Sequence, residues 1–108
     1  MATSTIWISF DLGVRGDYES MYEWLDSYDA KECSSNLAVL SYEYTGRLLD
    51  SLKSELKKTI AIDRRTRIYI IHWNALEKKI KGSFLFGTRK APPWTGYADG
   101  DEETEDES

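Results

Sequence analysis

The stretch Ile6–Asp17, IWISFDLGVRGD, limits the possible folds more than any other part of this sequence. Ile6, Ile8 and Phe10 alternate with residues of the opposite face, which predicts a β-strand. The two glycines that follow predict a turn, and Asp17 is then placed to cap a helix. The chain is therefore expected to start with a strand, a short loop and a helix.

Hydrophobic periodicity predicts the remaining elements, with spacings of three and four residues for helices and of two residues for strands. The two predicted long helices run from Asp17 to near Ala30 and over Leu48–Ile60, and a short helix capped by Asn74 is predicted over residues 75–81. The predicted strands are Leu37–Tyr44, which starts as early as Glu32, then Arg67–Trp73, and a strand or edge ribbon over Ser83–Phe86. Residues 1–5 are expected to be a disordered leader, and residues 88–98 an extended, polyproline-like arm.

Charge is unevenly distributed along the chain. The formal net charge is −5, but residues 99–108, DGDEETEDES, hold seven acidic and no basic residues, and the remaining 98 residues carry +2. Basic residues are concentrated between Lys57 and Lys90. We expect one domain over residues 1–98 and a disordered acidic tail over 99–108, which either solubilises the protein or competes internally for its basic surface.

The composition excludes several classes of site. Cys33 is the only cysteine and His72 the only histidine, so disulfide frameworks and zinc clusters are excluded. Cys33 is expected to be a plain thiol, and His72, on the face of Ile68 and Ile70, a satisfied core or interface residue more often than a general base. No apolar run reaches membrane-spanning length, and the sequence shows no signal peptide. We therefore expect a cytoplasmic protein.

Two strands are apolar on both faces. Trp7 lies opposite Ile6 and Ile8, and the strand Arg67–Trp73 repeats this pattern. Two helices can cover only one face of so small a sheet, so the second face needs another cover. We expect either the C-terminal arm or, preferably, a second copy of the chain to cover it. The residues expected in a homodimer interface are Trp7, Tyr69, Trp73 and Trp94.

Basic residues in the second half of the chain are interleaved with aromatic ones, which is typical of nucleic-acid surfaces, because phosphates attract Lys and Arg while bases stack on aromatic rings. A set of solvated surface charges explains the pattern about equally well. The predicted phosphate contacts are Arg64, Arg65, Arg67, Lys78, Lys79, Lys81 and Arg89.

The triplet Phe10-Asp11-Leu12, the helix start Gly16-Asp17-Tyr18 and the pair Ala30-Lys31 resemble the SinR-like proteins. These are relatives of the small CRISPR-associated endoribonuclease-like family, the dimeric partner of the spacer integrase. The resemblance implies an α+β, ferredoxin-like two-layer sandwich, with an antiparallel sheet and two helices on one face. It also implies a homodimer formed across the open sheet face.

In that family an Asp at the end of the first strand matches Asp11 and is proposed to bind Mg²⁺ across the dimer interface. The resemblance thus makes Asp11 the candidate metal ligand and catalytic residue. From the residues alone, Asp11 has a second interpretation, as a turn residue that accepts hydrogen bonds from loop amides between Gly13 and Gly16.

Two functions remain open. One is a dimeric protein that binds RNA or DNA, with Mg²⁺-dependent ribonuclease activity as an extension. The other is a non-catalytic dimeric adaptor that binds a protein partner through the aromatic arm, Pro92–Tyr97.

Overall fold

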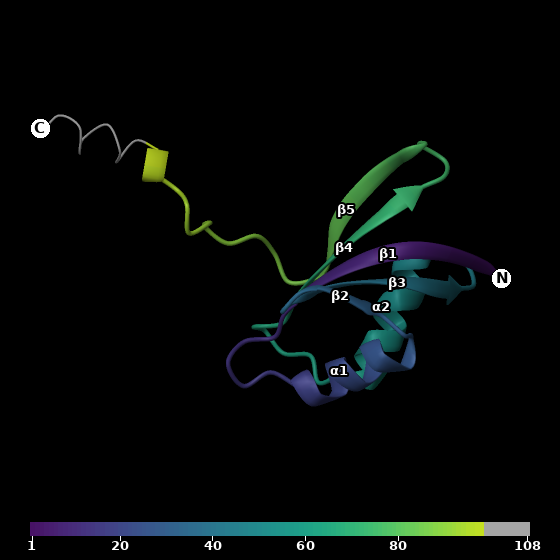
Figure 1. Cartoon of the computed structure of the whole chain (residues 1–108), viewed down its shortest axis with the longest axis horizontal. Coiled ribbons are helices and arrows are strands. Elements are labelled where there is room, and N and C mark those ends of the chain that lie inside the picture. Colours follow the sequence, from purple (N-terminus) through teal and green to yellow (C-terminus); the bar gives the residue numbers. More distant parts are fainter. Residues whose placement is uncertain (99–108) are drawn as a thin grey trace, which may run out of the picture.

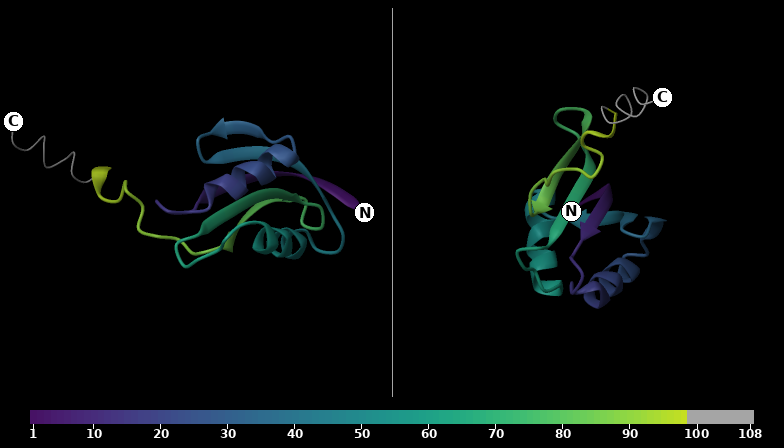
Figure 2. Two further views of the ribbon diagram at one scale, coloured as in Figure 1. Left: turned by 90° about the horizontal axis from the view of Figure 1, so that it is seen from below. Right: turned by 90° about the vertical axis from the view of Figure 1, so that its left-hand side faces the viewer.

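The computed structural model describes residues 1–98, and the predicted acidic tail lies outside the described residues. An antiparallel sheet of five strands, in the order β2-β3-β1-β4-β5, forms one layer. Two helices form the other layer and cover a single face of the sheet (Figures 1 and 2). The elements are β1 (Ala2–Asp11), α1 (Tyr18–Ser27), β2 (Lys31–Ser34), β3 (Leu37–Tyr44), α2 (Leu48–Thr59), β4 (Arg67–Asn74) and β5 (Lys79–Phe86).

The core lies between the sheet and the helices. Alternate residues of β1, β3 and β4 point toward the helices, as the period of two predicted. They meet the apolar faces of α1 and α2, and burial of these side chains is the main force that holds the two layers together. The central buried residues are Ile6, Ile8, Phe10, Met21, Trp24, Leu40, Tyr42, Leu52, Leu56, Ile68 and Ile70.

Three local predictions are wrong. Residues 2–5 of the predicted leader belong to β1, because β3 extends to Tyr44 and pairs with β1 as far as Ala2.

Residues 75–81 are not a helix. Asn74 accepts a hydrogen bond from the Glu77 amide (2.9 Å) and starts a turn, Lys78 has a positive φ of 56°, and Lys79 begins β5. Backbone pairing with the free edge of β4 therefore prevails over a helical pattern of only two turns.

The third wrong prediction concerns the C-terminal arm, which is not extended throughout. The Thr95 amide donates to the Pro92 carbonyl (3.2 Å) and the Tyr97 amide to the Trp94 carbonyl (3.1 Å), so this part of the arm forms turns. The arm leads away from the sheet and does not fold over its open face (Figure 1).

The predicted second strand is a pair, β2 and β3, joined by a two-residue turn. The sequence predicted one strand that starts as early as Glu32, and the structure has two strands over this range. The coarse fold class, α+β with an antiparallel sheet and two helices on one face, is confirmed.

A polar network joins the two helices to β3. Glu55 on α2 accepts hydrogen bonds from Trp24 Nε1 (2.7 Å) and the Tyr28 hydroxyl on α1, and from the Tyr42 hydroxyl on β3 (3.1 Å). The Tyr42 hydroxyl also contacts Ser51 Oγ (3.1 Å). One carboxylate thus connects three elements across the edge of the core.

The same network predicts a loss of stability at high pH. Burial, followed by the hydrogen bond to the Glu55 carboxylate, raises the pKa of Tyr28 well above its usual value of 10.0. The folded state therefore keeps a proton that the unfolded state releases, so this stabilisation is complete below pH 10 and declines as the pH rises further. We expect the free energy of unfolding to fall between pH 9.5 and 11, and to fall less in Tyr28→Phe. Urea denaturation across this range measures the difference, and equal slopes in the two proteins would contradict it.

Candidate nucleic-acid interface

The open face of the sheet, which carries no helix, is apolar at its centre. Trp7 on β1 pairs with Val39 on β3 and with Ile71 on β4, and all three are half-buried. Tyr69 pairs with Phe84 one row further along, and their rings meet edge to face at 4.9 Å. The open face is formed by Trp7, Leu37, Val39, Tyr69, Ile71, Trp73, Ile80 and Phe84.

The predicted interface residues are only partly brought together. Trp7, Tyr69 and Trp73 lie on the open face, where Trp73 is 54% exposed. Trp94 is 72% exposed and lies on the C-terminal arm, which leads away from the sheet (Figure 1). Ile80 and Phe84, which sequence reasoning missed, complete the surface from β5. Their signal was the alternation of Ile80, Gly82 and Phe84, which the short-helix interpretation of residues 75–81 obscured.

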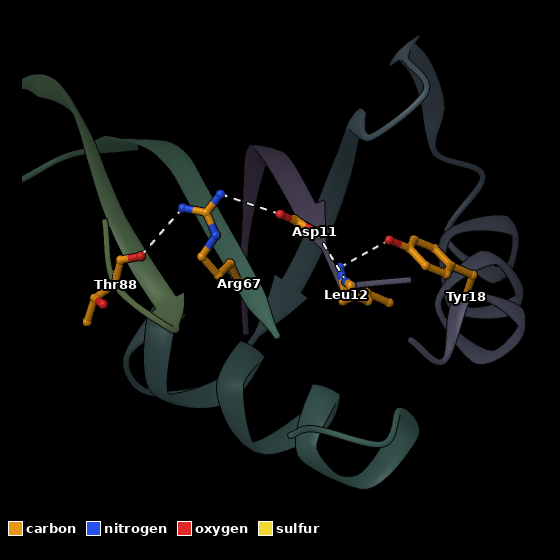
Figure 3. Close-up of polar contacts among 6 residues, drawn as sticks. Asp11, Leu12, Tyr18, Arg67 and Thr88 are labelled. Atoms are coloured by element: carbon orange, nitrogen blue, oxygen red, sulfur yellow. Dashed lines mark hydrogen bonds and ion pairs between the residues drawn. The ribbon is translucent and has the colours of Figure 1, made fainter. Parts of the chain in front are cut away.

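Asp11 ends β1 at the border of the open face, and its two carboxylate oxygens have different partners (Figure 3). Oδ1 accepts from the Gly13 amide (3.1 Å), and Oδ2 lies 3.4 Å from Arg67 Nη2. Gly13 has a positive φ of 82°, which lets the backbone turn back toward the carboxylate. The turn-capping interpretation of Asp11 is thus realised, while its side chain remains 48% exposed.

Arg67 connects three segments at this end of the sheet. Besides Asp11, its guanidinium donates through Nη1 to the Thr88 carbonyl (3.5 Å), just beyond β5 (Figure 3). Its Nε is buried and has no hydrogen-bond partner among residues 1–98. The positive charge of Arg67 is therefore partly neutralised by Asp11, and its Nη groups are already used in the fold.

Other arginines gather around Arg67. Arg64 and Arg65 lie in the loop before β4 and are exposed, and the Arg65 side chain approaches Gly13 in the β1–α1 loop. The Arg89 guanidinium lies 5.6 Å from the ring centroids of both Tyr69 and Phe84. We call this group the arginine-rich end: Arg64, Arg65, Arg67 and Arg89.

The predicted lysines lie elsewhere. Lys78, Lys79 and Lys81 belong to the β4–β5 hairpin tip, at the opposite end of the 8-residue strand β4 from Arg67. A strand of this length spans roughly 25 Å. Glu77 contacts Lys79 (3.4 Å) and Lys81 (2.6 Å), and this pairing lowers the pKa of Glu77. The structure therefore divides the single basic cluster expected from sequence into two groups.

Residues 1–98 hold no group of three or more His, Cys, Asp and Glu side chains close enough to form a metal centre. Each chain supplies one carboxylate, that of Asp11, to the predicted Mg²⁺ site. The predicted pair of carboxylate ligands therefore needs a second copy of the chain. A Mg²⁺ ion there would also have to compete with Arg67 for Oδ2. Mg²⁺ does accept sites with one or two carboxylates and several waters, so the residue type fits the ion.

Asp17, Cys33 and His72 were also singled out. Asp17 caps α1 by accepting from the Ser20 amide (3.2 Å), and it accepts from the Ala61 amide as well (3.0 Å). The latter bond, followed by those to Ser20, lowers the pKa of Asp17. Cys33 is exposed and free. His72 is buried on the helix-covered face of β4, as expected.

No helix within residues 1–98 combines the length and the apolar character needed to cross a lipid bilayer.

Comparisons with known proteins identify no relative: no family model, curated protein or solved structure matches this chain. The resemblance at Phe10–Leu12, Gly16–Tyr18 and Ala30-Lys31 therefore stays a prediction from the residues themselves.

Proposed function

We propose that this chain is a homodimeric nucleic-acid-binding protein whose arginine-rich end contacts phosphates. The observation that carries the proposal is the gathering of four arginines, from the loop before β4, from β4 and from the segment after β5, beside two aromatic rings. Arginine binds phosphate through a planar fork of donors. Arg64 and Arg65 are exposed, so their guanidinium groups are accessible to a ligand.

We further propose that two copies pack through their open faces. In support, Trp7, Val39 and Ile71 form an apolar row across the three central strands, and the arm does not cover it. A continuous apolar sheet face is a typical site of association, because burial removes its apolar surface from water. Such packing places the arginine-rich ends of both copies at the border of one interface.

The finer fold assignment is also a proposal. The five-stranded order differs from the four-stranded sheet of the ferredoxin-like fold, and we propose that β5 is an edge strand added to that sheet. In support, β1-α1-β2 and β3-α2-β4 are two strand–helix–strand units, and β1 and β3 are neighbours.

Binding of a labelled single-stranded RNA and of a DNA duplex, followed by fluorescence anisotropy, tests the phosphate contacts. We expect the double variant Arg64→Gln/Arg65→Gln to bind at least about tenfold more weakly than wild type, because two charged contacts are lost. The matched control is Lys57→Gln/Lys58→Gln, which removes two exposed charges from the C-terminal turn of α2. Equal losses in both double variants would contradict specific contacts at the arginine-rich end.

Cleavage is an extension of this proposal that rests on Asp11. In a dimer, two half-exposed Asp11 carboxylates at one interface could hold Mg²⁺ and an attacking water. We expect RNA cleavage that requires Mg²⁺ and is lost in Asp11→Asn, while RNA binding in EDTA is retained. If neither protein cleaves and both stay dimeric, Asp11 is a turn residue only.

The adaptor function is the second candidate, and the exposed arm favours it. Trp94 and Tyr97 are 72% and 71% exposed. Exposed aromatic residues on an arm are typical anchors for a protein partner. If the protein is dimeric but does not bind nucleic acid even at low salt, the adaptor function is favoured.

A further inference from the structure

The C-terminal arm begins at the arginine-rich end. Gly87, just before the arm, has a positive φ of 83°, and a Cβ atom there would lie only 2.7 Å from the Thr66 carbonyl oxygen. Only glycine therefore lets the chain pass so close to the loop before β4. The Thr88 carbonyl then accepts from Arg67, and the Arg89 guanidinium lies against two aromatic rings of the sheet. These contacts hold the first residues of the arm beside the proposed phosphate contacts.

Two exposed aromatic residues follow further along the arm. Trp94 and Tyr97 are 72% and 71% exposed, on a segment that leads away from the sheet (Figure 1). The backbone around them is already restricted, because the Thr95 amide donates to the Pro92 carbonyl, the Tyr97 amide donates to the Trp94 carbonyl, and Pro93 has a fixed φ. A segment restricted in this way loses less conformational entropy when its rings contact a ligand.

Charge divides the arm into two parts. Residues 88–98 contain two basic residues, Arg89 and Lys90, and no acidic residue. Both are exposed, and Lys90 makes no ion pair with residues 1–98. Seven acidic residues follow from Asp99 onward, so the positive charge is confined to the first part of the arm. A negatively charged group is therefore favoured at Arg89 and Lys90, and an uncharged one at the two rings.

A nucleic-acid strand presents both kinds of group, charged phosphates and flat, uncharged bases. Bases stack on exposed aromatic rings only when their faces are free, and the bases inside a duplex are already stacked on their neighbours. A protein partner would also use exposed aromatic residues, but it does not account for their position after two basic residues at the arginine-rich end. The placement of charge and rings thus favours an unpaired strand.

We propose that the arm binds single-stranded nucleic acid. The phosphates of the strand contact Arg89 and Lys90, and its unpaired bases stack on Trp94 and Tyr97. This inference rests on the proposed function and narrows it, because it makes a single strand, rather than a duplex, the preferred ligand. The loss of one base–aromatic stack lowers the affinity roughly tenfold.

Fluorescence anisotropy with three labelled ligands tests the stacking. The ligands are oligo(dT), its duplex with oligo(dA), and an abasic strand of the same length, which keeps the phosphates but has no bases. We expect the full chain to bind oligo(dT) most tightly, and Trp94→Ala to bind it about tenfold more weakly. Trp94→Phe, which keeps a ring, should lose less. All of these variants should bind the abasic strand like wild type.

The matched control is Leu76→Ala, which removes a 95% exposed apolar side chain from the β4–β5 turn, at the opposite end of β4 from Arg67. It should bind all three ligands like wild type. Tryptophan fluorescence gives a second readout of the contact. Oligo(dT) should quench it more than the duplex does, and the quenching should be much smaller in Trp94→Phe.

The results distinguish this inference from the proposed function. If Arg64→Gln/Arg65→Gln weakens binding but Trp94→Ala does not, the arginine-rich end binds phosphates without the arm and the inference is wrong. Equal affinity of the wild-type protein for oligo(dT) and for the abasic strand would also overturn it. If the wild-type protein binds none of the three ligands, the proposed function fails as well, and the aromatic residues of the arm are left to a protein partner.

Discussion

Glu55→Ala is expected to lower the free energy of unfolding by about 3 kcal/mol, because it leaves three donors of the helix–sheet network without their acceptor. Trp24 Nε1 and the Tyr28 hydroxyl have no other acceptor among residues 1–98, while Tyr42 keeps only its contact with Ser51. Urea denaturation followed by circular dichroism measures the change.

Two controls separate the network from the general effect of losing a glutamate. Glu23→Ala removes an exposed glutamate of α1 that makes no polar contact within the described part of the chain, and it should stay within about 0.5 kcal/mol of wild type. Glu55→Gln keeps one acceptor oxygen but turns an NH₂ group toward the remaining donors, so an intermediate loss is expected. A Glu55→Ala protein as stable as Glu23→Ala would show that the network does not stabilise the fold.

The second large effect is expected at the open face. Ile71→Glu should convert the proposed dimer to a monomer, with a dissociation constant raised about a thousandfold, because an unpaired charge buried in an interface costs about 4 kcal/mol. Ile71 is half-buried and lies between Trp7 on β1 and Gly82 on β5, at the centre of the apolar face. Its side chain points away from the helix-covered core, so the fold should persist.

Light scattering coupled to size-exclusion chromatography measures this change, with circular dichroism to verify the fold. Ser54→Glu is the matched control, since it adds the same charge at an exposed position of α2 on the opposite face of the sheet. If the wild-type chain is itself a monomer at high micromolar concentration, the dimer proposal is wrong. If Ile71→Glu stays dimeric, another surface forms the interface.

Sequence periodicity was sufficient where one face of an element is buried. β1, β3 and β4 alternate strictly, and α2 places Leu48, Leu52 and Leu56 on one side, so their buried faces could be predicted from spacing alone. The prediction failed for residues 75–81, because their two large apolar residues, Leu76 and Ile80, fit a short helix and a half-exposed strand about equally well. What decides between them is the free edge of β4, which is a tertiary feature.

The candidate site was predictable in residue type but not in arrangement. Charge counts placed Arg64 and Lys79 in one cluster, whereas the hairpin puts them at opposite ends of β4. The sequence also offered two roles for Asp11, and only the structure shows that Gly13 and Arg67 both contact its carboxylate.

The most direct test of nucleic-acid binding at the arginine-rich end is the salt dependence of RNA affinity. For single-stranded RNA, the logarithm of the binding constant falls linearly with the logarithm of the salt concentration, and each phosphate contact contributes about −0.7 to the slope. We predict a steep negative slope for the wild-type protein and a slope shallower by about 1.4 in Arg64→Gln/Arg65→Gln, which loses two contacts. Identical slopes in the two proteins, or an affinity that does not respond to salt, would contradict the proposed function.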